Sequence, residues 1–496
     1  MISRVLGFVR DIVIARFFGA DAGTDAFFVA FKIPNFMRRL FAEGAFSQAF
    51  VPVLSEYKEQ QSRESLKELI SATAGTLAVV LFFVTIIGVL AAPILIYIFA
   101  PGFAMADDRY EMSVAMLRLT FPYIFFISLT AMAGGVLNTF GKFAIPAVTP
   151  VFLNLSLLAA VFWLSPELET PIYALAWGVL LAGVVQLIFQ FPYLSRLGLL
   201  PKLRFDRAHA GVKRILKLML PALFGVSVTQ INLLLDTLLA SFLAAGSVSW
   251  LYFSDRLVEF PLGVFGIALA TVLLPGLSKN HAAGKSAEFS QSIDLSLRWV
   301  LLIGLPSALG LCFLAQPMLA TLFQYEAFSE DDVIQSSLSL MAYGVGLLGF
   351  ISVKVLVPGF TSRQDMKTPV RIGIIAVVAN MVMSVSLVFV WQHAGLALAT
   401  SLAAFVNAGL LMRALLKSGV YQPEKGWLLF AGKVLLANCV AGICYFYGYN
   451  AEQWTQWTVW ERVFELSVEI SRVFIVYGIV LFSLGIRPKQ MSVKPI

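Results

Sequence analysis

The amino-acid sequence predicts an all-α polytopic membrane protein with about 14 transmembrane helices. We expect two six-helix lobes, related by a parallel repeat, around a central cavity, followed by two extra helices. Three observations carry this prediction: the composition, the recurrence of apolar stretches, and an internal repeat. Of the 496 residues, 59% are hydrophobic and only 13% are charged, with a mean hydropathy of +0.84. A bilayer can solvate that much apolar surface, whereas a water-soluble fold cannot cover it with polar side chains.

Apolar stretches of spanning length recur from one end of the chain to the other. We expect helices near residues 2–20, 25–56, 70–100, 111–138, 144–165, 171–194, 215–244, 248–277, 292–323, 332–361, 369–391, 394–416, 426–448 and 463–485. Pro34, Pro261 and Pro358 lie inside three of these stretches. Because proline removes a helix hydrogen bond, we expect bends there.

The connections between these helices alternate in charge. One alternate set is basic, with residues such as Lys58, Arg204 and Arg487, while the other is acidic and has little basic beyond Arg109 and Arg462. Basic connections stay in the cytoplasm, so the sequence predicts an even number of spans and cytoplasmic N- and C-termini in a bacterial inner membrane. The net charge of +7 belongs to these connections, which argues against a nucleic-acid partner.

An internal repeat has an offset of 223 residues. PVLSEY at residue 52 matches PGLSKN at residue 275, Pro146 matches Pro369, and ALAWG at residue 174 matches ALATS at residue 397. Three matches in one register indicate a duplication. The repeated unit has an even number of helices, so both copies keep the same orientation. We therefore expect lobes at residues 1–205 and 206–420, with residues 421–496 outside the duplication.

Charged residues concentrate in the first, second and eighth predicted helices. They include Arg4, Arg10, Asp11, Asp25, Arg38, Glu43, Arg256 and Glu259. Intramembrane charges are costly and usually face a cavity. Arginine is well suited to phosphate, and the acids would hold the arginines or form gates. The alternative for any one of them is a structural ion pair or a side chain that reaches the interface.

Three further polar residues lie in predicted spans: Asp236, Asn380 and Thr400. Their oxygens could bind a coupling cation, although hydrogen bonds between helices are the alternative explanation. The sequence has no phosphate-binding loop, no nucleophile elbow and no metal-ligand cluster. We therefore expect no catalytic residues, no cofactor and no ATP-driven pump. Coupling by membrane potential or by a monovalent cation remains open.

Two long segments resemble the MurJ (MviN) family of lipid II flippases. The first is SRVLGFVRDIVIARFFGA with TDAFFVAFKIPNFMRRLFAEGAFSQAFVPVLSEY after it, and the second is GSVSWLYFSDRLVEFPLGVFGIALATVLLP. The turn VPGFTSRQDMKTPV continues the likeness, which covers essentially the whole chain. The resemblance places the chain in the MOP exporter superfamily.

This resemblance implies a substrate and a set of site residues. The substrate is lipid II, the undecaprenyl-diphosphate-linked peptidoglycan precursor, moved to the periplasmic leaflet by alternating access. The implied residues are Arg4, Arg10, Arg38, Arg256 and Ser249 in the cavity, and Asp11, Asp25, Glu43 and Glu259 as cavity or gate acids. The two extra helices would line a groove for the polyprenyl tail. Membrane lipids, and cell-wall synthesis proteins around a monomer, are the other expected partners.

One departure from the family concerns the start of the chain. Family members carry additional residues before the SRVLGF segment, so we expect a first helix without its usual beginning and a weakly held Arg4.

Two other functions are alternatives. Another exporter of the superfamily, such as an O-antigen flippase or a cation-coupled drug exporter, is the main alternative, although acids rather than arginines would suit cationic drugs. A membrane enzyme acting on lipid-linked sugars would need positioned carboxylates or a metal motif, and the sequence has none.

Overall fold

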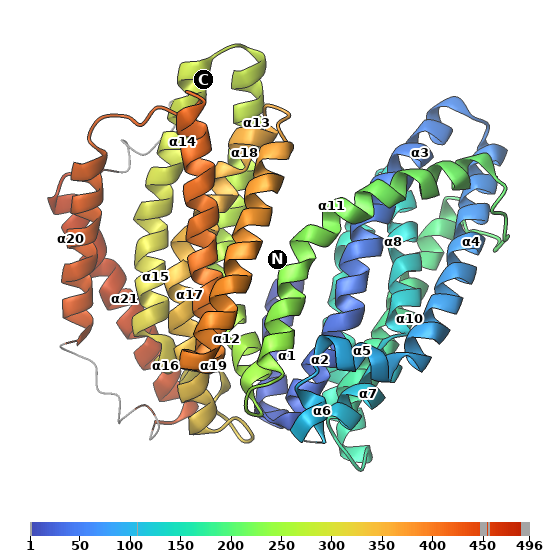
Figure 1. The fold of residues 1–496 in the computed structure, drawn as a ribbon, viewed down its shortest axis with the longest axis horizontal. Helices are drawn as coiled ribbons and strands as arrows, with labels where there is room; N and C mark the ends of the chain where they lie inside the picture. The colour runs from blue at the N-terminus through green and yellow to red at the C-terminus, as the bar shows by residue number, and fades with distance from the viewer. Residues whose placement is uncertain (1, 107, 447–453, 455–456, 488–496) are drawn as a thin grey trace. The chain divides into compact units, whose positions relative to one another are not determined.

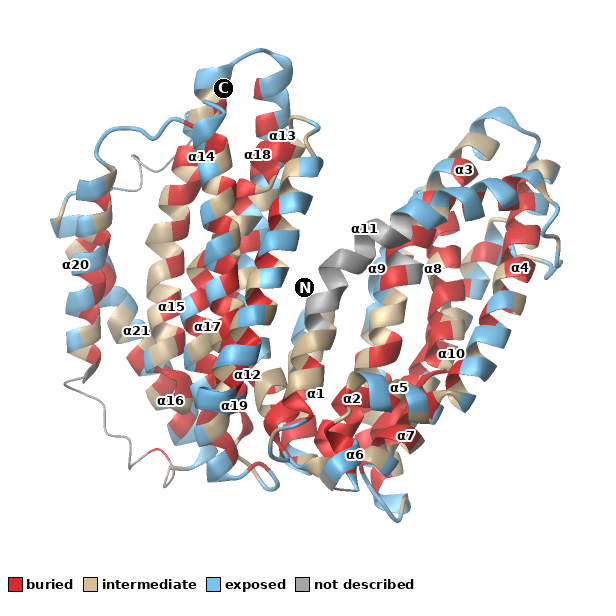
Figure 2. Cartoon of the chain, viewed as in Figure 1, coloured by how far each residue is buried: buried red, intermediate tan, exposed pale blue. Residues whose placement is uncertain are grey.

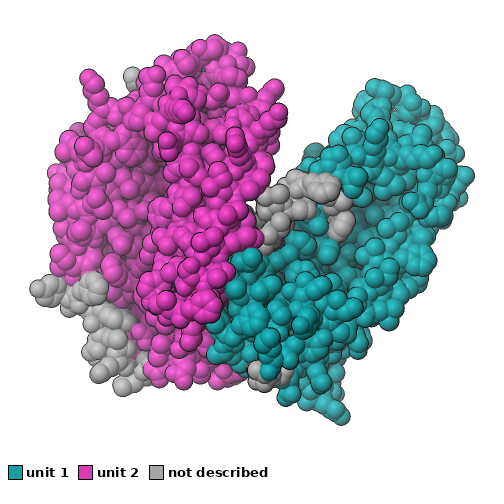
Figure 3. Space-filling view, in the orientation of Figure 1, with its two compact units in different colours: residues 1–249 teal, residues 250–496 magenta. Residues whose placement is uncertain are grey.

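The structure is a computed structural model that describes residues 2–106, 108–446, 454 and 457–487. Side chains are described for all of these except residues 2, 41–43, 106, 222–233 and 446. Within the described ranges the regular structure is entirely helical. The chain forms two compact units, Met1–Ser249 and Trp250–Ile496, which Figure 3 colours separately.

Unit 1 holds the helices up to α11 and the first residues of α12 (Figure 1). They are α1 (Ile2–Phe18), α2 (Ala22–Met37), the π-helix η1 (Arg38–Phe46), α3 (Ser47–Gln60), α4 (Arg63–Leu90), α5 (Ala92–Phe99), α6 (Phe103–Ala106), α7 (Arg109–Thr120), α8 (Tyr123–Thr139), α9 (Ala144–Ala159), the π-helix η2 (Ala160–Leu164), the 3-10 helix η3 (Ser165–Glu167), α10 (Tyr173–Arg196) and α11 (Ala210–Ala240).

Unit 2 holds the remaining helices, and α12 enters it at Trp250. They are α12 (Ser247–Pro261), the π-helix η4 (Leu262–Gly266), α13 (Ile267–Ala282), α14 (Ser286–Trp299), the π-helix η5 (Val300–Gly304), α15 (Leu305–Phe313), α16 (Ala315–Phe323), α17 (Glu330–Leu356), α18 (Pro358–Thr361), α19 (Lys367–Lys417), α20 (Trp427–Phe446) and α21 (Val459–Ser483).

The all-α membrane fold is confirmed. Every stretch that we expected to be helical contains helix, and 10 helices of the described chain are long and apolar enough to cross a membrane. The total of 14 spans is not tested by this number and stays a prediction. The expected helices at 369–391 and 394–416 share the label α19. A kink at Gln392, where φ is 48° and ψ is −128°, separates them.

Helical geometry changes close to each of the three prolines. Pro34 lies in the last turn of α2, directly before η1, and Pro261 ends α12 directly before η4. Pro358 begins α18, separate from α17. A proline leaves the carbonyl one turn earlier without its amide, and a π-turn is one way to absorb the mismatch. Moved back by the 223 residues of the repeat, η4 falls inside η1, which supports the proposed duplication.

The core of unit 1 is a set of large apolar side chains between η1, α3, α4 and α8. Phe46, Phe50, Leu69 and Val136 are all buried in this cluster. Figure 2 shows buried residues facing the inside of the helix packing and exposed residues at its turns. α11 also packs on unit 1, through contacts with η1 and α3. The predicted lobe boundary after residue 205 follows the repeat and stays a prediction.

In unit 2, α17 and α19 approach each other closely at a glycine. A Cβ built on Gly346 would lie 2.7 Å from the Cα of Ser401. Ser401 Oγ donates a hydrogen bond to the carbonyl of Ala342 at 2.7 Å, so the serine is held against α17. Only a residue without a side chain fits between these two helices at this point.

We therefore expect Gly346→Ala to destabilise the protein by about 1–3 kcal/mol, because the added methyl group overpacks the contact. The measurement is the thermal unfolding midpoint of the purified protein in detergent. Gly409→Ala is the matched control in α19, where a Cβ would meet no atom within 4 Å. Alanine is the better helix former, so the control should keep or raise the midpoint. Equal losses in both variants would contradict the close contact.

Candidate functional site

Arg10, a predicted cavity residue in α1, is held by hydrogen bonds to two side chains. Arg10 Nε and Nη2 donate to Asp11 Oδ1 at 2.9 and 2.6 Å, and Arg10 Nη1 donates to Asn154 Oδ1 at 3.0 Å. Arg10 is 7% exposed and Asp11 is 1% exposed. The predicted role of Asp11, an acid that holds an arginine, agrees with this pairing. A buried charge of this kind needs such a partner, because desolvation alone would be prohibitive.

Asn154 is a site residue that the sequence analysis did not single out. It lies in α9, and its Nδ2 donates to the carbonyl of Ser3 at 3.0 Å while its Oδ1 accepts from Arg10. One amide therefore holds both the start of α1 and the Arg10 guanidinium. An uncharged amide within an apolar helix gives a weak sequence signal, since asparagine also bridges helices without any further role.

The other predicted residues at this end of the chain lie in α1, α2 and η1. Arg4 is exposed in the first turn of α1. Arg38 donates from Nε and Nη2 to Asn35 Oδ1, at 3.0 and 2.7 Å, where α2 gives way to η1. Glu43 belongs to η1, and its side chain is outside the part of the structure that is described. π-turns are frequent at functional sites, so the position of Arg38 at the start of one is consistent with a working role.

A second buried cluster is centred on Asp25. Its Oδ1 accepts hydrogen bonds from the backbone amide and the hydroxyl of Ser249, at 2.8 and 2.7 Å, and its Oδ2 accepts from the amide of Gly246 at 2.8 Å. Gly246 has a φ of +94°, which favours glycine. Gly246 directly precedes α12 and Ser249 lies in its first turn, so the carboxylate lies at a helix N-terminus, where unpaired amides and the helix dipole favour an anion. Asp25 and Ser249 are fully buried.

Arg109 completes this cluster and was not predicted as a site residue. Its Nη1 lies 3.7 Å from Asp25 Oδ2, and both of its terminal nitrogens donate to the carbonyl of Leu243, at 3.3 and 3.4 Å. The guanidinium also lies 4.6 Å from the centre of the Phe103 ring. The cluster therefore ties α2, α7 and the connection from α11 to α12 together.

In unit 2, Arg256 and Glu259, both predicted as site residues, form an ion pair with each other. Arg256 Nη1 donates to Glu259 Oε2 at 2.7 Å, and Arg256 Nη2 donates to the Tyr252 hydroxyl at 2.9 Å. The guanidinium lies 4.7 Å from the centre of the Tyr252 ring. The Arg256 side chain is 31% exposed and that of Glu259 is 52% exposed, so an incoming anion can reach the arginine.

The residues predicted for a cation site fall in different units. Asp236 lies half-buried in α11 of unit 1, whereas Asn380 and Thr400 lie in α19 of unit 2. The structure gives no placement of one unit against the other. For the same reason it does not place Arg256 relative to the arginines of unit 1.

Comparisons with known proteins agree on one family. The sequence family described as Lipid II flippase MurJ matches residues 14–466. A protein of Vibrio cholerae serotype O1, described as a probable lipid II flippase MurJ, is 46% identical over 99% of this chain and 95% of its own length. The Lipid II flippase MurJ of Burkholderia cenocepacia is 44% identical over 92% of this chain and 89% of its own length.

Solved structures extend the similarity to the fold. A lipid II flippase MurJ in an inward closed conformation has a TM-score of 0.81 and 26% identity, covering 96% of both chains. An inward-facing multidrug resistance transporter of the MATE family, in the MOP superfamily, has a TM-score of 0.68 at 14% identity, covering 84% of this chain and 95% of that one, which shows a shared fold alone. With its apolar spanning helices, this chain is an integral membrane protein and belongs to the lipid II flippase MurJ family.

Proposed function

We propose that this protein is a lipid II flippase, which moves undecaprenyl-diphosphate-linked peptidoglycan precursor across the inner membrane for cell-wall synthesis. The observation that carries the proposal is near full-length identity of 46% to a relative described as a probable lipid II flippase MurJ. The substrate is a large amphiphile with a diphosphate, a sugar-peptide headgroup and a long isoprenoid tail. A drug exporter of the same fold is less well supported, because the paired cationic groups favour an anionic cargo.

The paired arginines suit a diphosphate. Arg10 and Arg256 each carry a carboxylate partner within 2.7 Å. A diphosphate has more oxygens and more charge than one carboxylate, so it can compete for the same guanidinium through charge-assisted hydrogen bonds. The carboxylates then keep each arginine oriented and its charge balanced when no substrate is bound. This exchange of partners allows binding and also release.

The Asp25 cluster suits a gate. Its contacts join the start of α12 to α2 through one carboxylate, and breaking them would free several buried groups together. Alternating access needs a contact that is stable in one conformation and broken in the other. With the cytoplasmic termini that the loop charges indicate, this cluster would lie toward the periplasm. The protein would work as a monomer. Membrane potential acting on the cavity charges would contribute about 2.3 kcal/mol per 100 mV for each charge that crosses the whole field.

Arg256→Ala should lower lipid II translocation by about 10- to 100-fold, because one charge-assisted contact to the diphosphate is lost. The measurement is lipid II accessibility at the outer leaflet, in cells whose only copy of this protein is the variant. Arg256→Lys keeps the charge but not the planar fork, so it should recover part of the activity. Lys279→Ala is the control for charge removal from an exposed position in unit 2. Full translocation by a folded Arg256→Ala protein would contradict phosphate binding by this residue.

Asp25→Asn should loosen the start of α12, since the amide removes the charge and one acceptor oxygen. We expect hydrogen exchange at the backbone amides of Gly246 and Ser249 to rise by about tenfold. Exchange measured by mass spectrometry on the purified protein reports this directly. Asp108→Asn is the control at an exposed position in unit 1, whose side chain makes no cap hydrogen bond. Unchanged protection in Asp25→Asn would show that the gate does not depend on this carboxylate.

The proposed monovalent-cation coupling is tested at Asp236, a half-buried carboxylate of α11. If a cation binds there, Asp236→Asn should abolish the dependence of translocation on sodium or on pH, because a neutral amide holds a monovalent cation poorly. The measurement compares transport rates in vesicles with and without an imposed ion gradient. Asp331→Asn, exposed in unit 2, is the control. Gradient dependence that survives in Asp236→Asn would contradict cation binding at this residue.

A further inference from the structure

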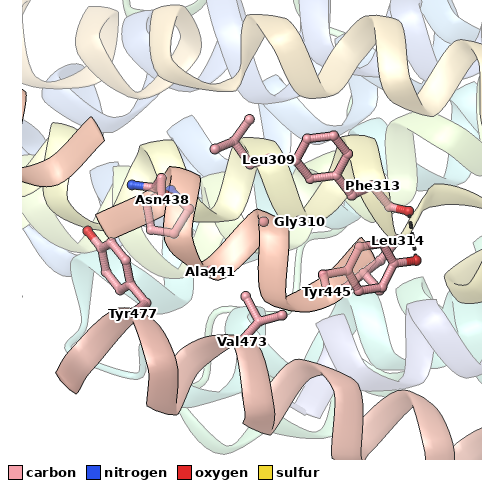
Figure 4. Close-up of a pocket in the computed structure, with 11 residues that line it drawn as sticks. Leu309, Gly310, Phe313, Leu314, Asn438, Ala441, Tyr445, Val473 and Tyr477 are labelled. Carbon is pink, nitrogen blue, oxygen red and sulfur yellow. Dashed lines mark hydrogen bonds between the residues drawn. The ribbon is translucent and has the colours of Figure 1, made fainter. Parts of the chain in front are cut away.

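Buried charges join helices of unit 2 at several points. Asp294 of α14 accepts a hydrogen bond from Trp427 Nε1 of α20 at 2.6 Å, and Arg462 of α21 donates to the carbonyl of Ala320 of α16 at 3.1 Å. The helices α15, α20 and α21 border an apolar pocket of about 30 Å³ (Figure 4). A space of this size holds about one water molecule, so this side of unit 2 is closely packed. The contacts at the start of α12 depend on a different carboxylate, Asp332.

Asp332 of α17 uses its two carboxylate oxygens for different helices. Its Oδ2 accepts from the backbone amide and the hydroxyl of Ser329, both at 2.9 Å, and completes the capping box of α17. Its Oδ1 accepts from Trp250 Nε1 of α12 at 2.8 Å. Asp332 is 8% exposed, so both sets of bonds are largely shielded from water, which strengthens them. One carboxylate thus fixes where α17 begins and holds the first turn of α12 against it.

One helical turn further along, α12 and α17 meet again. Ser254 is fully buried, and its Oγ lies 2.7 Å from the carbonyl of Ser336 and 2.7 Å from that of Trp250. Because the hydroxyl has one hydrogen, it donates to one of these carbonyls at a time. The indole of Trp250 also contacts the His393 ring of α19, with 5.0 Å between the ring centres. The two contacts between α12 and α17 are spaced by four residues on each helix, so they lie in one register.

Asp332 occupies the position in unit 2 that Arg109 occupies in unit 1. The two residues are 223 residues apart, which is the offset of the internal repeat, and each lies in the first turn of its helix, α17 or α7. Arg109 holds the chain just before α12 through the carbonyl of Leu243, whereas Asp332 holds α12 itself through Trp250. Equivalent positions of the two copies therefore carry opposite charges, and both act on the same short stretch of chain at the start of α12.

We propose that Asp332 is a positioning residue of the gate, which holds the first turn of α12 on α17 and so competes with Asp25 for the same helix end. The proposal rests on the Asp25 cluster acting as the gate of the proposed flippase. The Asp25 bonds reach α12 as far as Ser249, and the Asp332 bond holds the next residue, Trp250. When the Asp25 bonds break, the contacts of Trp250 and Ser254 keep α12 in a defined place. Without them, the first turn of α12 stays with Asp25 and the gate opens less often.

The first experiment uses Trp250→Phe, which removes the N–H donor and keeps an aromatic ring. We expect hydrogen exchange at the backbone amides of Gly246 and Ser249 to become about threefold to tenfold slower, because a hydrogen bond that opposes the Asp25 contacts is lost. The measurement is exchange by mass spectrometry on the purified full-length protein without substrate. A residue that only supports the fold would give the opposite sign, with faster exchange at these amides. Trp391→Phe, at an exposed indole of α19, is the matched control and should leave exchange unchanged.

The second experiment measures translocation of lipid II in reconstituted vesicles over a range of substrate concentrations. Trp250→Phe should lower the maximal rate by about threefold to tenfold and leave the half-saturating concentration within about twofold, because the arginines that suit the diphosphate are unchanged. Asp332→Asn should act in the same direction, since an amide accepts from the indole less strongly than a carboxylate. The double variant should be no slower than the slower single variant, because both changes weaken the same bond. The altered capping box is common to both Asp332→Asn proteins and cancels in this comparison.

Three results would overturn the proposal. They are faster or unchanged exchange at the two amides in Trp250→Phe, additive losses of rate in the double variant, and an equal loss of rate in Trp391→Phe. If Trp250→Phe does not fold, as judged by its thermal unfolding midpoint, Ser254→Ala takes its place, because it removes only the second contact and must change exchange and rate with the same signs. Failure of the unsubstituted protein to move lipid II would instead contradict the proposed function. The exchange measurement needs no substrate, so it still decides the role of Asp332.

Discussion

A charge that leaves water must find a partner, and this constraint shapes both units of the protein. Moving an ion into a low-dielectric interior costs far more than most packing contacts return, so a buried charge without a partner is not stable. Asp25, Asp294 and Arg462 are each almost completely buried, and each is bonded to polar atoms of a segment far away in the sequence. Because these partners come from distant parts of the sequence, each buried charge fixes helices relative to one another at one point.

The helices were largely predictable, since hydrophobic periodicity and length are local properties of a sequence. Every expected stretch contains helix, and the changes near Pro34, Pro261 and Pro358 follow from the missing amide of proline. The sequence also indicated Arg10, Asp11, Arg256 and Glu259 as charged residues inside predicted helices, although not which of them pair.

The rest of the site depends on contacts between segments more than a hundred residues apart. Asn154 meets Arg10, and Ser249 meets Asp25, only after the chain has folded. One signal was nevertheless present: Arg109 and Arg462 are the two basic residues in otherwise acidic connections. Both are buried in the structure and bonded to carbonyl groups. An exception to the charge bias of the loops can therefore mark an arginine that is retained for a structural contact rather than for membrane orientation.

α12 starts in unit 1 and ends in unit 2, so one continuous helix is shared by both units. A helix resists bending along its length, so the residues at its two ends absorb any change of backbone direction. At the start of α12, Gly246 has the backbone freedom to turn, and its amide donates a hydrogen bond to the Asp25 carboxylate. At the C-terminal end of α12, the wider π-turns of η4 follow Pro261. Arg256 lies between these two points, so the carboxylate cluster of unit 1 and this guanidinium of unit 2 share one continuous helix.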